Sequence, residues 1–81
     1  MKIFYPPRFK ARLANCPNVV QRKFYKQAGY LLQSIRHPSL NAKKYDESTG
    51  VWQARVDRNF RFYFLIAGDT YILLSIGPHP K

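Results

Sequence analysis

Acidic residues are scarce in this sequence. The 81 residues include only four Asp and Glu against fourteen Lys and Arg, so the formal net charge is +10 at pH 7. This excess goes beyond what solubility requires and indicates a polyanionic partner, either nucleic acid or an acidic protein, with a membrane surface as a weaker candidate. The four carboxylates are scattered and form neither a paired-carboxylate site nor a metal cluster, which disfavours metal-dependent hydrolysis. They are Asp46, Glu47, Asp57 and Asp69.

Cysteine and long apolar runs are equally scarce. Cys16 is the only cysteine, which excludes an internal disulfide and a cysteine-based metal site. The longest apolar stretches, Phe62–Ala67 and Tyr71–Leu74, are too short to cross a bilayer. The first ten residues contain no run typical of a signal peptide. We therefore expect a protein of the reducing cytoplasm, with no cofactor and no metal.

Hydrophobic residues, at 46% of the sequence with 16% aromatic, suffice for one modest core in a chain of this length. No repeat, low-complexity segment or linker interrupts the sequence, so we expect a single domain over residues 1–81. Ile3-Phe4-Tyr5 predicts a short strand, and Pro7 can begin a short helix. From Val19 to Ile35 apolar residues recur close to every 3.6 positions and predict a second helix. It should end before Pro38, with His37 in the turn.

The second half of the chain has the period of strands. Val51–Asp57 and Phe60–Ile66 alternate, and Tyr71–Ile76 is nearly all apolar, as a central strand would be. Gly68-Asp69 suits a tight turn between the last two. The sequence therefore predicts an α+β fold: a short N-terminal strand, two helices and an antiparallel three-strand meander, with the helices packed on one face of the sheet.

Alternation in the strands decides which side chains share a face. If the helices cover Ala54 and its neighbours Trp52 and Val56, the opposite face shows Arg55 and Arg61 together. This register requires a three-residue turn or a bulge, and Asn59 tolerates the left-handed conformation that such a turn needs. A plain two-residue turn would place the arginines on opposite faces. The apolar alternation favours the shared face, which would also show Gln53 and Tyr63.

An exposed face with two arginines, a tyrosine and a nearby His79 is typical of an RNA phosphate site. Arginine matches phosphate oxygens and stays charged, and histidine transfers protons near neutrality. RNA is cut without metal when its own 2′-OH attacks the adjacent phosphate, so the protein needs only to position, stabilise charge and move protons. The alternative is that Arg55 and Arg61 are ordinary solvated strand residues and His79 an idle surface histidine.

Further residues are candidates for holding RNA. Tyr63 is better placed than Trp52 to stack on a base, since Trp52 has the spacing of a core residue. For the adjacent Lys43 and Lys44, the alternative is that they lie in an ordinary solvated loop. The remaining basic and polar candidates are Lys43, Lys44, Gln53, Arg58 and Lys81.

Several motifs together resemble the RelE/ParE superfamily of toxins from type II toxin–antitoxin systems. The resemblance covers nearly the whole chain and implies a sheet packed on two helices, a neutralising antitoxin and, in the RelE-like branch, ribosome-dependent mRNA cleavage. It is carried by His37-Pro38-Ser39-Leu40, Lys43-Lys44-Tyr45, Val51–Val56, Phe60–Tyr63 and Gly68–Gly77.

The resemblance also implies roles for single residues. Arg61 resembles the strand arginine that contacts the scissile phosphate, and Arg55 the basic residue of the preceding strand. His79 falls where members carry a basic residue or histidine used in proton transfer or charge stabilisation. Gln53 departs from the pattern, because some RelE-type toxins carry a second basic residue there.

Retention of these residues and the high positive charge favour the RelE-like branch. We therefore expect a metal-independent mRNA endoribonuclease that acts on the ribosome, with mRNA and the ribosome as partners. An antitoxin should place an acidic segment over the Arg55/Arg61 face, or along the helix at Val19–Ile35 and its neighbour. The alternatives are a non-catalytic ParE-like inhibitor of DNA gyrase and an inactive binding module of the same fold.

Overall fold

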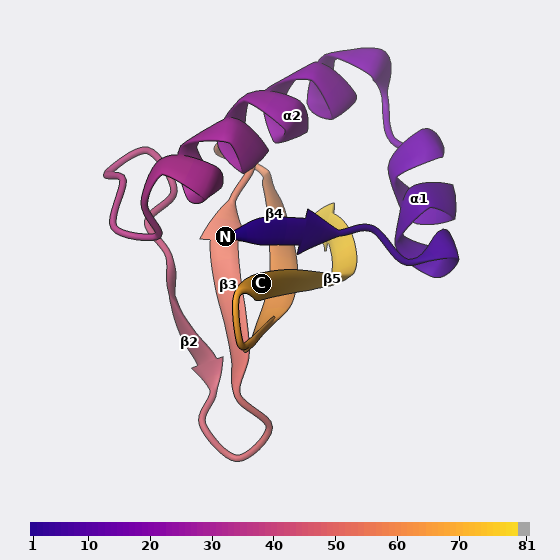
Figure 1. Cartoon of the computed structure of the whole chain (residues 1–81). Helices are drawn as coiled ribbons and strands as arrows, with labels where there is room; N and C mark the ends of the chain where they lie inside the picture. Colours follow the sequence, from indigo (N-terminus) through magenta and orange to yellow (C-terminus); the bar gives the residue numbers. More distant parts are fainter. Residues whose placement is uncertain (80–81) are drawn as a thin grey trace.

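Two helices lie on one face of a five-stranded sheet in the computed structural model, which describes residues 1–79 (Figure 1). The strand order is β1-β5-β4-β3-β2; β1 runs parallel to β5 and the other pairs are antiparallel. The predicted α+β class and the packing of the helices on one face are confirmed. The elements are β1 (Lys2–Phe4), α1 (Pro7–Ala14), α2 (Asn18–Gln33), β2 (Lys43–Asp46), β3 (Val51–Arg55), β4 (Phe60–Ala67) and β5 (Thr70–Pro78).

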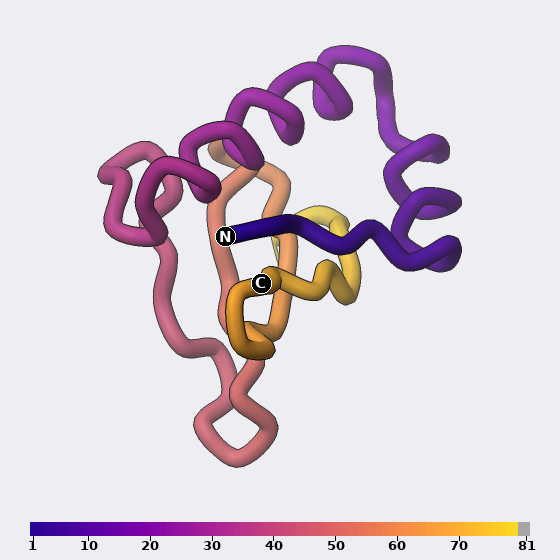
Figure 2. The backbone as a smooth tube through the Cα atoms, in the orientation of Figure 1, coloured from indigo at the N-terminus to yellow at the C-terminus, as the bar shows by residue number. Residues whose placement is uncertain are grey.

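The predicted meander is present as β3, β4 and β5, but the predicted strand count was one too low. Residues 43–46 form a further strand, β2, at the edge of the sheet beside β3. Its sequence is Lys-Lys-Tyr-Asp, which has no apolar alternation to signal a strand. Edge strands commonly carry lysine, because charge there discourages pairing with other chains. At the opposite edge, the N-terminal segment runs beside β5 (Figure 2).

A proline lies at the start of each helix, and each helix packs an apolar face against the sheet. Pro7 is the first residue of α1 and Pro17 precedes α2, positions where the missing proline N–H costs no helical hydrogen bond. The predicted stripe on α2 was partly wrong, because Val19 and Leu32 are exposed. In the described part of the chain, no helix has the length and apolar character needed to span a membrane. The apolar residues that the helices bury most deeply are Phe9, Leu13, Val20, Phe24, Ala28 and Leu31.

Phenylalanine rings occupy the centre of the core. Phe24 of α2 meets Phe62 of β4 edge to face, with 5.2 Å between ring centroids, and Phe64 lies next to Phe62. Each such side chain contributes about 1.5–3 kcal/mol by its burial. Ala54 and Val56 are buried on the same face, as predicted, whereas Trp52 is only half-buried at the edge of this core. Ile66, at the far end of β4, is exposed.

The β3–β4 connection decides where the arginines lie. The Val56 N–H donates to the Phe60 carbonyl (3.0 Å), so residues 57–59 form a three-residue turn. Arg55 is consequently the partner of Arg61, and the predicted register is confirmed. The prediction of a left-handed Asn59 is wrong. Among the described residues other than glycine, a positive φ is found at Asn41 and not at Asn59. Asp57 holds the turn instead: its Oδ1 accepts the N–H groups of residues 59 and 60 at 2.8 Å each.

Candidate functional site

The sheet face opposite the helices carries two arginines side by side. Arg55 on β3 and Arg61 on β4 are direct cross-strand partners. Like charges directly opposite each other destabilise a sheet, so the pair indicates a surface suited to an anion. On the other side of Arg61 its partner is Gly77 of β5. A Cβ added at Gly77 would meet no atom within 4 Å, so the Gly77 end of this row, which we call the arginine row, is open.

Carbonyl groups of the hairpin turn hold the Arg61 guanidinium. Its Nη1 donates to the carbonyl oxygens of Asp57 (2.7 Å), Phe60 (3.0 Å) and Arg58 (3.3 Å). Burial lowers the pKa of Arg61 from its ordinary value, and the neighbouring Arg55 lowers it further. The side chain nevertheless stays protonated in a protein. Within residues 1–79 these bonds all use Nη1, so Nη2 and Nε remain for a ligand.

The backbone of Arg55 is fixed from two directions. Its N–H donates to the Leu40 carbonyl (2.8 Å), and its own carbonyl accepts from Gln27 Nε2 (2.7 Å). Gln27 is buried in α2, and its amide is completed by Ser39, whose Oγ donates to Gln27 Oε1 at 2.9 Å. Sequence reasoning missed Gln27. The available signal was a polar residue on the buried face of the helix, three positions after Phe24.

The remaining candidates near the hairpin lie at its tip. The His79 N–H donates to the Asn59 carbonyl (2.7 Å), which continues the ladder past the end of β5. His79 is exposed and follows the last residue of β5, so its backbone lies beside the hairpin turn that holds Arg61. Arg58 is exposed in the turn, and Lys81 lies outside the described residues. Among residues 1–79, no three His, Cys, Asp or Glu side chains gather in a way that could hold a metal ion.

The structure separates the two adjacent lysines. Lys43 is the partner of Gln53 and shares the arginine face, whereas Lys44 is the partner of Trp52 and lies on the opposite face. The Lys44 Nζ is 5.4 Å from the centroid of the Trp52 ring. Gln53 was predicted to be exposed, but only 7% of it is accessible, and its Nε2 donates to the Tyr63 hydroxyl at 3.2 Å. Gln53 therefore supports Tyr63 and has little surface for a ligand.

Solved structures with this arrangement are toxins and toxin–antitoxin complexes. A YoeB/ParE toxin from Agrobacterium tumefaciens aligns with a TM-score of 0.78 at 11% identity, covering 99% of this chain and 100% of that one. The RelE–RelB complex from the archaeon Pyrococcus horikoshii gives 0.72 at 16% identity, covering 95% and 90%. The RelBE2 complex from Mycobacterium tuberculosis gives 0.76 at 15% identity, covering 96% of both chains. The fold is that of the RelE/ParE toxins. Neither a scan of protein-family models nor a search of curated proteins gives a match.

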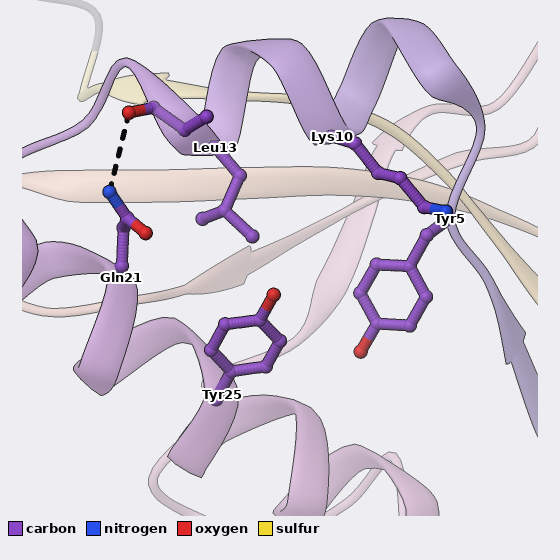
Figure 3. A pocket seen from close by; sticks show the side chains of 6 residues that line it. Tyr5, Lys10, Leu13, Gln21 and Tyr25 are labelled. Carbon is purple, nitrogen blue, oxygen red and sulfur yellow. Dashed lines mark hydrogen bonds between the residues drawn. The ribbon is translucent and has the colours of Figure 1, made fainter.

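On this RelE/ParE fold, a hollow of about 410 Å³ opens between α1 and α2. In Figure 3 the Leu13 side chain and the rings of Tyr5 and Tyr25 border it, and Gln21 bonds back to the end of α1. Burial raises the pKa of Tyr5, and Tyr25 raises it further. None of the four acidic residues precedes Asp46, so both helices are wholly basic in their charge. Their charged residues are Arg8, Lys10, Arg12, Arg22, Lys23 and Lys26.

A second hollow, of about 360 Å³, lies on the arginine face of the RelE/ParE sheet. It is lined by Tyr45, Val51, Tyr63, Leu74 and Ser75. Sequence reasoning proposed Tyr63 from its strand position but missed Tyr45, because the strand that carries Tyr45 was itself not predicted.

Proposed function

We propose that this chain is the toxin of a type II toxin–antitoxin system and inhibits translation as a metal-independent endoribonuclease that cuts mRNA on the ribosome. The arginine row carries this proposal: two cations lie side by side on the face opposite the helices, one is fixed by backbone carbonyls, and the space at the neighbouring Gly77 is open. Such an arrangement suits a phosphate whose negative charge grows during reaction. The shared fold with toxins crystallised alone and with antitoxins supports it.

In the proposed reaction Arg61 binds the scissile phosphate and Arg55 stabilises its additional charge. The 2′-oxygen of the RNA attacks the adjacent phosphorus, and the bond from phosphorus to the 5′-oxygen breaks. The products are a 2′,3′-cyclic phosphate and a free 5′-OH, so a proton leaves the 2′-OH and one reaches the 5′-oxygen. His79 serves in this proton transfer, for which histidine is suited near neutral pH.

Induced expression followed by mapping of mRNA ends tests the proposal, with DNA supercoiling assayed in parallel. We expect cuts within translated codons, and Arg61→Ala should lower cleavage by about 10²–10³ while the protein still folds. Arg36→Ala is the matched control, since this exposed arginine lies after α2 and is not part of the paired strands that form the arginine row. Gyrase-linked DNA breaks without mRNA cuts would replace the proposal with the gyrase-inhibitor alternative. If a folded Arg61→Ala protein kept full toxicity, Arg61 would have no catalytic role.

We also propose that the antitoxin lays an acidic segment along α1 and α2. Of the two surfaces expected from the sequence, the helical one joins six basic residues, of which Lys23 is paired with Asp57 (3.4 Å), to an apolar hollow. An acidic segment with one aliphatic or aromatic anchor fits both features, because charge speeds association while a buried anchor supplies lasting affinity. Tyr25, at 56% exposed, offers the largest ring surface at this hollow.

A further inference from the structure

The hollow on the arginine face coincides with two irregularities of the sheet. The β2–β3 register shifts between Lys44 and Asp46, which leaves Tyr45 as the extra residue. The β4–β5 register shifts after Tyr63, which leaves Leu74 as the extra residue. Bulges re-aim side chains and are frequent next to functional sites. Here both extra residues line the same hollow.

The first bulge brings two tyrosines together over this hollow. The rings of Tyr45 and Tyr63 meet edge to face, with centroids 5.0 Å apart and planes at 68°. The buried Gln53 amide holds the Tyr63 hydroxyl from below. Tyr45 is 56% exposed, so much of its ring is open to a ligand. An exposed aromatic side chain on a basic face is the kind of surface on which unpaired nucleobases stack.

The second bulge adds polar groups and places the hollow next to the arginine row. Ser75 is the partner of Tyr63 across β4 and β5, and Lys43 the partner of Gln53 across β2 and β3. This cross-strand row therefore carries a lysine at one end and a serine hydroxyl at the other. It is two positions along the strands from Arg55 and Arg61, or about 6–7 Å at the usual rise of a strand. A phosphate on the arginines and a base in the hollow are thus within reach of one short stretch of RNA.

We propose that this hollow is a subsite for a nucleobase of single-stranded RNA, with Tyr45 as the stacking platform and Ser75 at the base edge. The inference rests on the proposed function, because the base in the hollow would belong to the same RNA strand that is cut at the arginine row. Serine and tyrosine hydroxyls both donate and accept, so they discriminate weakly between base edges. Preference should follow stacking strength, and purines should bind a few-fold more tightly than pyrimidines.

Binding of short RNA to the full chain tests the subsite. The probe is a single-stranded oligonucleotide with 2′-O-methyl groups, which prevent cleavage, and 2-aminopurine at one position. Tyr45→Ala should weaken binding roughly 5- to 150-fold, the equivalent of about 1–3 kcal/mol, and abolish the quenching of 2-aminopurine. Tyr45→Phe should keep both, because the ring remains. Leu32→Ala, which removes an exposed apolar side chain from α2, should behave as wild type.

The subsite would be overturned if Tyr45→Ala bound the probe as wild type does, if Leu32→Ala lost as much affinity, or if an abasic position were bound as well as a purine. These outcomes are separate from the test of the proposed function. Loss of cleavage in Arg61→Ala together with unchanged binding by Tyr45→Ala would keep the nuclease and remove the subsite. Tyrosine-dependent base binding by a chain that cuts no mRNA would keep the subsite and remove the nuclease.

Discussion

Arg61 lies where its positive charge is energetically unfavourable. The side chain is half-buried, faces a second arginine directly across the sheet, and is held by carbonyl oxygens. Burial and the neighbouring charge both oppose ionisation, which is why the pKa of Arg61 falls. A bound phosphate would relieve both effects at once. We therefore expect the two arginines to contribute more to binding and chemistry than to stability.

Gly77 gives a steric test of where the phosphate lies. Gly77→Val should place a side chain above the arginine row without strain in the chain, since the site is open and φ is not positive there. Valine suits a strand, so the free energy of unfolding should be unchanged or raised by up to about 1 kcal/mol. Cleavage should fall at least tenfold if phosphate occupies this space. A folded Gly77→Val protein with full activity would contradict the proposed position.

His79 gives a test of proton transfer. His79→Ala should lower single-turnover cleavage by on the order of 10²–10⁴ while leaving affinity for the uncleavable oligonucleotide unchanged. His79→Gln is the companion variant, because it keeps hydrogen bonding and removes titration near neutral pH. Recovery of most activity in His79→Gln would show that the residue acts only by hydrogen bonding or position.

At the scale of elements, the β3–β4 hairpin is the device that assembles the site. The turn at residues 57–59 sets the register of the arginines and supplies carbonyls to Arg61. Burial alone would raise the pKa of Asp57, but the amides of Asn59 and Phe60 and the nearby Lys23 hold it below its ordinary value. The ionised carboxylate thus stabilises the turn.

Asp57→Asn should therefore destabilise the protein by about 1–2 kcal/mol at pH 7. Because the folded-state pKa is lowered, this contribution is present above the unfolded pKa of about 3.9 and is lost as pH falls through the folded value. The difference between wild type and Asp57→Asn in denaturant unfolding should accordingly shrink below about pH 4. Asp69→Asn, which removes an exposed carboxylate 3.9 Å from Lys2 Nζ, is the control and should lower the free energy of unfolding by less than Asp57→Asn does, because exposed ion pairs contribute little. If the difference in unfolding free energy between wild type and Asp57→Asn stayed constant across pH, the charge of Asp57 would not be its cause.

The elements also show how far sequence reasoning reached. Apolar periodicity predicted both helices, β3, β4 and β5, and the arginine register, because buried faces impose that periodicity. It missed β2, whose pairing depends on backbone hydrogen bonds along an edge and not on apolar burial. Tyr45 and the hollow were missed with it. The burial of Gln27 and Gln53 was missed for a related reason, since a glutamine in a sequence gives no sign of the partner that will satisfy its amide.

For the whole molecule, the distribution of charge separates two surfaces. The helices carry basic residues with no acidic neighbour in sequence, and the arginine row lies on the opposite face of the sheet. A toxin bound along its helices by an acidic antitoxin therefore need not have its arginines covered by the same segment. Neutralisation then requires a second segment, or occlusion of the ribosome by the bulk of the complex.

If an acidic antitoxin binds along the helices as proposed, its association should depend on salt. We expect the association rate to fall steeply as ionic strength rises from 50 to 500 mM, while dissociation changes little. Tyr25→Ala should speed dissociation, and Tyr45→Ala should leave it unchanged if the partner lies along the helices. The reverse result would move the antitoxin to the arginine face. An association rate indifferent to salt would argue against electrostatic steering altogether.

The parallel pairing of β1 with β5 has a consequence for the order in which the chain folds. Residues 2–4 are held by residues 70–72, so this contact closes the longest loop in the sheet and should form late. During synthesis α1 and α2 are made first, and their phenylalanine face waits for the strands that will cover it. At about 5–20 residues per second the wait from the end of α2 to the end of β5 is on the order of 2–9 s. Throughout that interval the row of Arg55, Arg61 and Gly77 is incomplete. If the chain is the toxin proposed above, its antitoxin would have this time to bind the helices before the opposite face exists.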